Sequence, residues 1–375
     1  CCKMQSMNKK KLPSEITSLA DIQTLASSGF ADWKRYGEVS VDADGDLLIF
    51  NYTPKAQYEA RWNFFERVSR GLIVNRATGE IVARPFDKFF NWSEDGRYAA
   101  GHIVTVTEKM DGSLGILYRL NNSYRISTRG AFHSEQAEWA TKFLNAHFDL
   151  KDLPNELTLL FEIIYPENRV VVDYHGEEKL VLLAARNRVS GDYLPFFPDV
   201  YEMGQKYGIP LPKVFTFNNV SDIIRITGSL SVDEEGYVIE FSDGQRFKIK
   251  GDRYLEMHRL IFGLSFKNTL LAVMNDTVDY VRSQLPDEFL KDFNRWVNEI
   301  QTTIAETKAN VQTAFDAAPK ATRKDFAIWV MENHKPLAPY LFALFDGKDL
   351  MPMIYKMAFQ DRPNEKAVKQ TESTA

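Results

Sequence analysis

Ionisable side chains gather in four short segments whose residue types fit one chemistry. The segments are Lys109-Met110-Asp111-Gly112, Phe161-Glu162-Ile163, Glu235-Gly236-Tyr237-Val238 and Lys248-Ile249-Lys250. A lysine amine becomes a nucleophile only when it is deprotonated, and a nearby cation or metal ion lowers its pKa. Two ammonium groups side by side, such as Lys248 and Lys250, attract an anion such as a phosphate. Lys109 is therefore the candidate nucleophile of a site with an anionic ligand.

β-Strands are predicted to carry these groups. In residues 103–109 polar and apolar side chains alternate, which places Lys109 at the end of a strand. Gly112 is expected to permit a tight reversal, after which residues 113–120 and 124–129 form further strands of an antiparallel meander. This arrangement would seat the Lys109 amine on a rigid platform.

The acids are also predicted to lie on strands. Glu162 is the one charge in the apolar run 157–164, and a buried carboxylate needs a cation or strong donors as its partner. Glu235 opens a strand beside Gly236, which would let a ligand approach the backbone. The two lysines of residues 246–250 share one face of a further strand.

Taken singly, these segments also have purely structural explanations. The Asp-Gly pair at 111–112 is a common hairpin signal, and Lys248 and Lys250 could be the solvated face of an edge strand. The remaining alternatives are an ion pair of Glu162 with Arg169 or Arg186, and a charged loop around Arg84 and Lys88. The occurrence of all four segments in one order favours the functional interpretation.

The four segments resemble, in order and approximate spacing, motifs I, III, IV and V of the covalent nucleotidyltransferases. That superfamily comprises ATP-dependent DNA ligases, RNA ligases and mRNA capping enzymes. The flanking sequence is similar to one branch, the phage RNA ligase 1 family, from about residue 45 to about residue 260. The stretches that carry this likeness are Ser69–Ile73, Arg84–Asn91, Ser134–Ala137 and Phe247–Tyr254.

The resemblance implies a three-step reaction that joins RNA ends. Lys109 would attack the α-phosphorus of ATP and expel pyrophosphate, which leaves a lysyl-AMP adduct. The AMP would pass to an RNA 5′-phosphate, and a 3′-hydroxyl would then displace it to form a phosphodiester. Phosphoryl transfer depends on positioning and charge neutralisation, so ATP and Mg²⁺ (or Mn²⁺) are the expected co-substrate and metal. RNA repair is the expected role, with tRNA as a candidate substrate.

The same resemblance implies the site residue by residue. Lys109, Lys248 and Lys250 are expected to be catalytic, and Glu162 and Glu235 to contact ribose or hold the metal. The expected nucleotide-binding residues are Arg70, Lys88, Phe90, Asp111, Gly112, Arg129, Glu162, Glu235, Lys248, Lys250 and Tyr254. Arg129 departs from the family pattern, which has lysine there, and the planar fork of arginine is not equivalent to an ammonium.

Composition restricts where RNA could bind. The chain has 46 Lys and Arg against 51 Asp and Glu, a net charge of −5, so an RNA-binding surface must be a local stripe. Both cysteines are at positions 1 and 2, which excludes an internal disulfide and fits the cytoplasm, that of a host if the gene is a phage gene. No apolar run reaches membrane-spanning length. A monomer without a membrane partner is expected.

An α+β fold in consecutive parts is expected. The parts are an N-terminal basic tail and helix (1–44, helix from Ser14 to Ala26), packed on or part of the next domain; an antiparallel-sheet nucleotidyltransferase domain (45–260, with a helix at 135–147); an all-α C-terminal domain (261–362); and a flexible tail (363–375). Apolar residues recur at helical spacing from Phe289 to Phe315, and further helices are expected at 327–331 and 341–344.

Two rival functions remain open. A DNA ligase or capping enzyme shares the motifs, but it usually carries an OB-type β-barrel directly after motif V, where this sequence turns helical. The second rival is a decayed, non-catalytic fold that binds RNA ends. Intact Lys109, Glu162 and Glu235 argue against decay.

Overall fold

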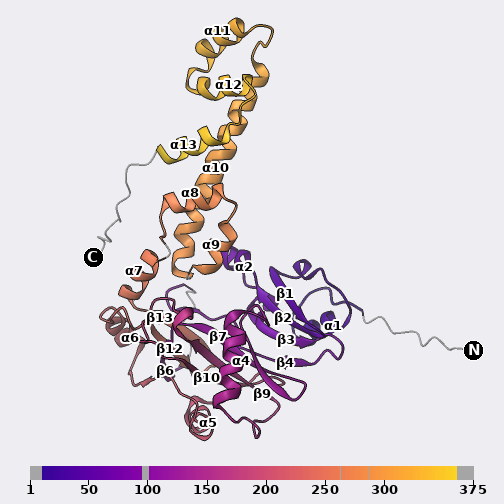
Figure 1. Cartoon of the computed structure of the whole chain (residues 1–375), viewed down its shortest axis with the longest axis vertical. Coiled ribbons are helices and arrows are strands. Elements are labelled where there is room, and N and C mark those ends of the chain that lie inside the picture. Colours follow the sequence, from indigo (N-terminus) through magenta and orange to yellow (C-terminus); the bar gives the residue numbers. More distant parts are fainter. Residues whose placement is uncertain (1–10, 95–100, 262, 286, 361–375) are drawn as a thin grey trace, which may run out of the picture. The chain divides into compact units, whose positions relative to one another are not determined.

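The chain divides into two compact units, residues 1–261 and residues 262–375 (Figure 1). The computed structural model describes residues 11–94, 101–261, 263–285 and 287–360. The basic tail expected at the N-terminus and the flexible tail expected at 363–375 lie largely or wholly outside the described residues. Each unit is considered by itself.

The first unit begins with a four-stranded antiparallel sheet in the order β1-β2-β3-β4. Its strands are β1 (Val39–Asp44), β2 (Leu47–Tyr52), β3 (Arg70–Asn75) and β4 (Ile81–Ala83), and the helices beside them are α1 (Leu19–Ser27), a 3-10 turn (Trp33–Arg35), α2 (Pro54–Glu59) and α3 (Phe64–Val68). Ile22 and Leu25 of α1 pack with Phe50 and Leu72 in a core from which water is excluded. Each such side chain contributes about 1.5–3 kcal/mol when fully buried.

The N-terminal helix starts later than the sequence predicts. Ser14 was expected to open it, but α1 begins at Leu19 because Ser18 forms the stronger cap. The Ser18 hydroxyl accepts from Asp21 N, while the Asp21 carboxylate accepts from Ser18 N at 2.8 Å. This reciprocal capping box satisfies two backbone donors at once.

The second sheet has the antiparallel order β10-β9-β7-β8. Its strands are β7 (Ser113–Leu120), β8 (Ser123–Ser127), β9 (Leu157–Ile164) and β10 (Lys179–Asn187), followed by a π-helical turn (Phe196–Val200) and α5 (Tyr201–Tyr207). Helix α4 (Glu135–His147), which has the bounds predicted from the sequence, lies across this sheet (Figure 1). Its Ala140 and Leu144 belong to the same buried core cluster as Phe161 and Ile163 of β9.

The third sheet has the order β11-β6-β12-β13-β5, with β5 parallel to β13. Its strands are β5 (Phe90–Asn91), β6 (Ile103–Glu108), β11 (Val214–Phe215), β12 (Gly236–Phe241) and β13 (Arg246–Lys250), with α6 (Val220–Thr227) beside them. Val106, Ile223, Ile239 and Phe247 form its core. The strand that carries the paired lysines is thus an interior strand.

The predicted meander through residues 103–129 is wrong in one respect. β7 and β8 do form an antiparallel hairpin, but β6 belongs to the third sheet and pairs with β12, not with β7. The Lys109–Gly112 segment therefore passes from one sheet to another instead of reversing within one. This crossing brings the residues that follow β6 next to β9.

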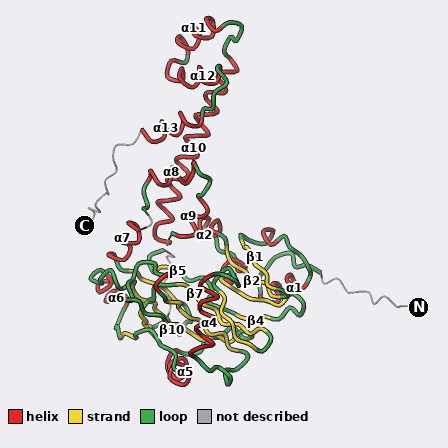
Figure 2. The backbone as a smooth tube through the Cα atoms, in the orientation of Figure 1, coloured by secondary structure: helices red, strands yellow, loops and turns green. Residues whose placement is uncertain are grey.

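In the described part of the second unit every assigned element is a helix or a 3-10 turn, and loops join these elements (Figure 2). α7 (Asp252–Ile261) closes the first unit, and the helices beyond it are α8 (Phe266–Met274), α9 (Val278–Gln284), α10 (Asp287–Ala317), α11 (Arg323–Asn333), a 3-10 turn (Lys335–Leu337), α12 (Ala338–Phe345) and α13 (Met351–Gln360). The 31-residue α10 contains the predicted apolar spacing, with Phe289 and Phe293 buried. Among the described residues no helix is both long enough and apolar enough to span a bilayer.

Candidate active site

Glu235 holds two lysines that come from different strands. Lys109 directly follows β6, and its backbone N–H donates to the Gly236 carbonyl at 2.9 Å. Gly236 is the register partner of Lys250. The Lys109 Nζ lies 2.6 Å from Oε2 of Glu235, and the Lys250 Nζ lies 3.2 Å from Oε1 of the same carboxylate. Sheet pairing thus places two ammonium groups on one acid.

Glu235 is ionised because these lysines face it. Glu235 is only 3% exposed, and burial alone would raise the pKa of its carboxyl group. The charges and hydrogen bonds of Lys109 and Lys250 outweigh burial, so the pKa of Glu235 lies below its ordinary value. The negatively charged Glu235 carboxylate therefore lies buried between the ammonium groups of Lys109 and Lys250.

Glu162 is a carboxylate without such support. It lies on β9 opposite Leu114, the second residue of β7. Burial raises the pKa of Glu162 to about 8, an effect that Lys109 opposes and that Glu235 and Asp111 reinforce. In the described part of the chain no group donates a hydrogen bond to its carboxylate. A divalent cation is the partner that this carboxylate fits.

Asp111 clamps the segment that follows the candidate nucleophile. Its Oδ2 accepts from the backbone N–H groups of Val171 and Val172 at 2.9 and 2.8 Å, and its Oδ1 accepts from the Tyr254 hydroxyl at 2.9 Å. The backbone N–H of Asp111 donates to the Tyr174 hydroxyl oxygen at 2.9 Å. Asp111 and Tyr254, which are both expected to contact the nucleotide, are thus joined by a hydrogen bond.

The two motif glycines are needed for close approach of backbone to backbone. A Cβ on Gly112 would lie 2.5 Å from the Ile163 carbonyl oxygen, so the crossing segment touches β9 beside Glu162. A Cβ on Gly236 would lie 2.0 Å from the Ile249 carbonyl oxygen. The tight reversal expected at Gly112 is wrong, because the segment passes from β6 to β7 of another sheet, whereas the approach of a ligand to the backbone at Gly236 stays a prediction.

A second group of predicted residues surrounds Lys88. This lysine is 6% exposed, and its ammonium lies over the ring of Phe90 and over two rings that sequence reasoning missed, Tyr52 and Trp62. Arg129, in the place of the expected lysine, donates to the Tyr52 hydroxyl at 3.0 Å. Tyr52 and Trp62 carry no charge and belong to none of the four motifs, so no signal in the sequence marks them.

Arg70 and Lys248 complete the predicted set. Arg70 is half-buried on β3, its Nη1 is buried without a hydrogen-bond partner, and its charge lowers the pKa of Glu162. Lys248 is half-buried on β13, two positions from Lys250 and thus on the same strand face. Its carbonyl accepts from the Trp92 N–H at 3.0 Å.

The structural alternatives for these charges do not hold. Glu162 pairs with neither candidate arginine, because Arg169 binds Asp173 and Arg186 binds Asp87, each at 2.9 Å. β13 lies between β12 and β5, so the paired lysines are not the solvated face of an edge strand. Lys88 is too deeply buried for a surface loop.

The described residues contain no cluster of three or more His, Cys, Asp or Glu side chains that could hold a metal ion by itself. Magnesium sites at phosphates commonly use one or two carboxylates together with phosphate oxygens and water. Glu162 and Glu235, both near Lys109, match that smaller requirement.

Comparison with known proteins assigns the chain to a family. A family model described as RNA ligase matches residues 68–256, a range that contains all four motifs. The chain therefore belongs to the RNA ligase family, in its phage type.

Three relatives show the extent of the likeness. The chain is 32% identical over 254 residues to a bifunctional polynucleotide kinase/RNA ligase of Autographa californica nuclear polyhedrosis virus, covering 57% of this chain and 35% of that protein. It is 23% identical over 391 residues to the RNA ligase of Rhodothermus phage RM378, covering 81% of this chain and 86% of the phage protein. An archaeal ATP-dependent RNA ligase structure, 15% identical, aligns over 72% of this chain and 77% of its own with a TM-score of 0.45. The chain thus spans about a third of the viral relative.

Proposed function

We propose that this protein is an ATP- and Mg²⁺- or Mn²⁺-dependent RNA ligase that acts through Lys109. In the first step the Lys109 amine, after losing a proton, forms a bond to the α-phosphorus of ATP. The bond from that phosphorus to the oxygen bridging to the β-phosphate breaks, and pyrophosphate leaves with the electron pair. The observation that carries the proposal is the contact of Glu235 with both Lys109 and Lys250.

The geometry gives each of these three residues a task. Glu235 fixes the Lys109 side chain at 2.6 Å before the substrate binds. Lys250, with a side chain only 8% exposed, supplies a positive charge that an α-phosphate can share. A divalent cation bound beside Lys109 would favour the neutral amine and so help it lose its proton before the attack.

A divalent cation bound by Glu162 and Glu235 would neutralise phosphate charge and lower the cost of expelling pyrophosphate. Glu162 suits this task because its high pKa falls when a cation is bound, which releases a proton. Arg70 lies near enough to Glu162 to affect its charge and offers a buried, unpaired Nη1 donor to a nucleotide oxygen.

The second and third steps join the RNA ends. An RNA 5′-phosphate oxygen attacks the phosphorus of lysyl-AMP, the P–N bond to Lys109 breaks, and the amine regains a proton. A 3′-hydroxyl then attacks the activated 5′-phosphate and AMP leaves, which produces a 3′–5′ phosphodiester. Lys248 and Lys250 are placed on one face of β13, where they can stabilise the charge on the attacked phosphate.

DNA ligation and capping are less well supported than RNA ligation. Directly after β13 the chain forms α7, and among the described residues from 251 to 360 every assigned element is a helix or a 3-10 turn. No strand is available there to build the barrel that usually follows motif V in those enzymes. A non-catalytic binder of RNA ends would not need the buried Lys109–Glu235 pair.

The test is strand sealing with matched substrates. A 5′-phosphorylated RNA with a 3′-hydroxyl should be circularised or joined with ATP and Mg²⁺, and the Lys109→Ala variant should not do this. Sealing of a DNA nick but not of RNA would favour a DNA ligase. Labelling of the protein by GTP but not ATP would favour a capping-type enzyme, and binding of RNA ends without any sealing would favour the non-catalytic alternative.

We also infer that the helical second unit, which we treat as a C-terminal domain from residue 262 on, contributes to the choice of RNA. The inference rests on its position after the last motif and on its helical content. Full-length protein should seal a nicked tRNA anticodon loop faster than an unstructured strand with the same ends. Equal rates for the two substrates would remove the tRNA-repair role.

A further inference from the structure

Asn91, at the end of β5, has a buried amide without a hydrogen-bond partner. The residue is only 5% exposed, and neither its Nδ2 nor its Oδ1 has a partner among the described residues. Its backbone is satisfied, since its carbonyl accepts from Glu94 N at 3.1 Å. Burying an amide that makes no hydrogen bond costs stability, and nearly all buried polar groups in folded proteins have a partner. The unpaired amide therefore indicates a group that is kept for a ligand.

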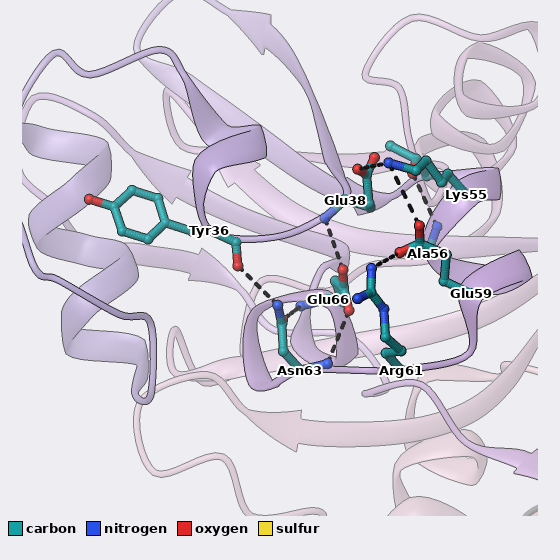
Figure 3. A network of polar contacts seen from close by, with 9 residues as sticks. Tyr36, Glu38, Lys55, Ala56, Glu59, Arg61, Asn63 and Glu66 are labelled. Atoms are coloured by element: carbon teal, nitrogen blue, oxygen red, sulfur yellow. Dashed lines mark hydrogen bonds and ion pairs between the residues drawn. The ribbon is translucent and has the colours of Figure 1, made fainter.

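An asparagine with a structural task, Asn63, shows the contrast (Figure 3). Its Nδ2 donates to the Tyr36 carbonyl at 2.9 Å, and its Oδ1 accepts from Glu66 N at 2.9 Å, which caps α3. Asn63 is exposed, so water could satisfy its amide, and yet both amide atoms have a partner in the protein. The amide atoms of Asn91 are buried and have none among the described residues.

Sheet pairing places the Asn91 side chain on the same face as the paired lysines. β5 runs parallel to β13, and Asn91 is the register partner of Lys248. Register partners direct their side chains to one face of a sheet, and residues two apart on a strand share that face. The next residue, Trp92, packs on Phe247 in the core of the sheet, with ring centroids 5.2 Å apart, so alternation turns Asn91 away from this core. Asn91, Lys248 and Lys250 therefore lie on one face.

This face of the sheet belongs to the candidate active site. Lys250 lies 3.2 Å from the Glu235 carboxylate, which in turn lies 2.6 Å from the Lys109 ammonium. Neighbouring strands are about 4.8 Å apart, and two residues along a strand span about 6.7 Å. Asn91 is thus one strand away from Lys248 and diagonal to Lys250. A ligand held by the two lysines can reach the amide of Asn91.

A second buried donor borders the segment that carries Asn91. The Arg70 guanidinium lies 5.6 Å from the ring centroid of Phe89, two positions before Asn91. Its Nη1 is buried without a hydrogen-bond partner among the described residues, and its charge opposes the burial that raises the pKa of Glu162. An anion with several oxygens would satisfy both donors, and a hydrogen bond to a charged group is stronger than one between neutral groups.

The chemistry of the amide restricts the ligand. The Nδ2 of an asparagine only donates hydrogen bonds, and its Oδ1 only accepts them. A phosphate oxygen can accept from Nδ2 and be shared with the Lys248 ammonium, but a free phosphate has few protons to offer to Oδ1. A ribose hydroxyl can donate to Oδ1. A ribose phosphate therefore satisfies both atoms of the Asn91 amide.

We propose that Asn91 binds a ribose phosphate in the candidate active site, with Nδ2 donating to a phosphate oxygen and Oδ1 accepting from a ribose hydroxyl. This inference rests on the proposed ligase function and deepens it by adding a binding residue that lies outside the predicted set. The ribose phosphate belongs either to the AMP part of ATP or to the RNA end.

The experiment compares Asn91→Leu with the unchanged full-length protein. Calorimetry with Mg²⁺ measures Kd for two probes, an ATP analogue with a methylene group between the α- and β-phosphates and an RNA strand with a 5′-phosphate and a 3′-hydroxyl. Loss of a hydrogen bond to a charged group should raise Kd about 10- to 100-fold. A rise for the ATP analogue assigns the ribose phosphate to AMP, and a rise for RNA assigns it to the RNA end. The 2′- or the 3′-deoxy form of the affected probe should bind the unchanged protein more weakly, but not Asn91→Leu.

Thermal unfolding without ligand separates binding from a structural role, with Asn63→Leu as the matched control. Leucine resembles asparagine in shape and has no polar atom, so Asn91→Leu should unfold at the same Tm as the unchanged protein or at a higher one. Asn63→Leu removes a helix cap and should lower the Tm by about 2–4 °C.

The proposal is overturned if Asn91→Leu lowers the Tm as much as Asn63→Leu does, if neither Kd changes by more than about twofold, or if neither deoxy probe binds the unchanged protein more weakly. These measurements do not require ligation. An unchanged protein that binds the probes but neither forms lysyl-AMP nor seals RNA would contradict the ligase function and leave the binding role of Asn91 intact.

Discussion

The Lys109 Nζ lies 2.6 Å from Oε2 of Glu235, a residue 126 positions further along the chain. The two meet because β6 pairs with β12, so that the end of one strand faces the start of the other. Lys250 approaches the second carboxylate oxygen from β13. The candidate nucleophile is thus held by the acid that also holds a candidate phosphate ligand.

Replacing Glu235 with glutamine should leave two ammonium groups facing each other without their shared anion. We expect the free energy of unfolding to fall by about 3–5 kcal/mol, since removing one member of a buried ion pair leaves uncompensated charge. Urea unfolding of the variant and the unchanged protein at pH 7 measures this. Lys109→Met, which removes one of the two ammoniums, should restore part of the loss in the double variant; additive losses would show that the three groups are not coupled.

The stability of the protein should depend on pH through Glu162. Its folded pKa of about 8 lies above the ordinary value of 4.5, so the folded state binds one more proton than the unfolded state between these limits. The contribution is therefore complete below about pH 4.5 and is lost as the pH rises toward 8. Relative to Glu162→Gln, the unchanged protein should lose a few kcal/mol of unfolding free energy over this range. Parallel pH profiles for the two proteins would contradict the account.

Binding of Mg²⁺ should release a proton if the cation binds Glu162. At pH 7 a carboxyl group with a pKa near 8 is mostly protonated, and a cation displaces its proton. Calorimetric titrations with Mg²⁺ and a non-hydrolysable ATP analogue, in buffers of different ionisation enthalpy, count the protons released. Glu162→Gln should remove this release, and an unchanged count would place the cation elsewhere.

Asp111→Asn should destabilise the segment that follows Lys109. An amide NH₂ cannot accept the bonds that Val171, Val172 and Tyr254 now donate, so at least one buried donor loses its partner, at a cost of about 1–3 kcal/mol. Tyr254→Phe removes a single hydrogen bond and should cost about 1 kcal/mol. Thermal unfolding of both variants tests whether Asp111→Asn costs more stability than Tyr254→Phe. An equal loss of stability in the two variants would show that the bonds from Val171 and Val172 to Asp111 contribute little.

Much of the local structure could be predicted from sequence, whereas its long-range pairing could not. The apolar run at 157–164 and the helix at 135–147 were predictable because their periodicity lies in consecutive residues. The transfer of β6 to another sheet depends on pairing with β12, which no local pattern encodes. The helix cap is Ser18, four residues after the expected Ser14, because Ser18 forms the reciprocal bonds with Asp21.

In the candidate site, too, some residues could be predicted from the sequence and others could not. The charged residues were recognisable from their types and order, and the structure brings Lys109, Glu235 and Lys250 into contact. Trp62, whose ring the Lys88 ammonium overlies, was not recognisable, because it carries no charge and belongs to none of the four motifs. Gly112 was recognised as a turn residue, whereas the structure shows that the Ile163 carbonyl oxygen lies only 2.5 Å from where its Cβ would be.

Gly236→Ala should be far more harmful than Gly244→Ala in the same hairpin. Both glycines have positive φ, +142° and +80°, but a Cβ on Gly236 would lie 2.0 Å from the Ile249 carbonyl oxygen, whereas one on Gly244 meets nothing within 4 Å. We expect a loss of about 3 kcal/mol or more for the first and about 1 kcal/mol for the second. Denaturant midpoints of the two variants compare these costs. Similar midpoints would show that the close approach of β12 and β13 is not required.

The central claim is that the Lys109 amine takes up the adenylyl group. The direct measurement is to incubate the full-length protein with ATP and Mg²⁺, digest it at a pH that preserves phosphoramidates, and map the added AMP by mass spectrometry. The account predicts AMP on the peptide that contains Lys109, at that side chain, and none in the Lys109→Ala variant. AMP on Lys88, Lys248 or Lys250 instead, or an adduct that persists in Lys109→Ala, would contradict it.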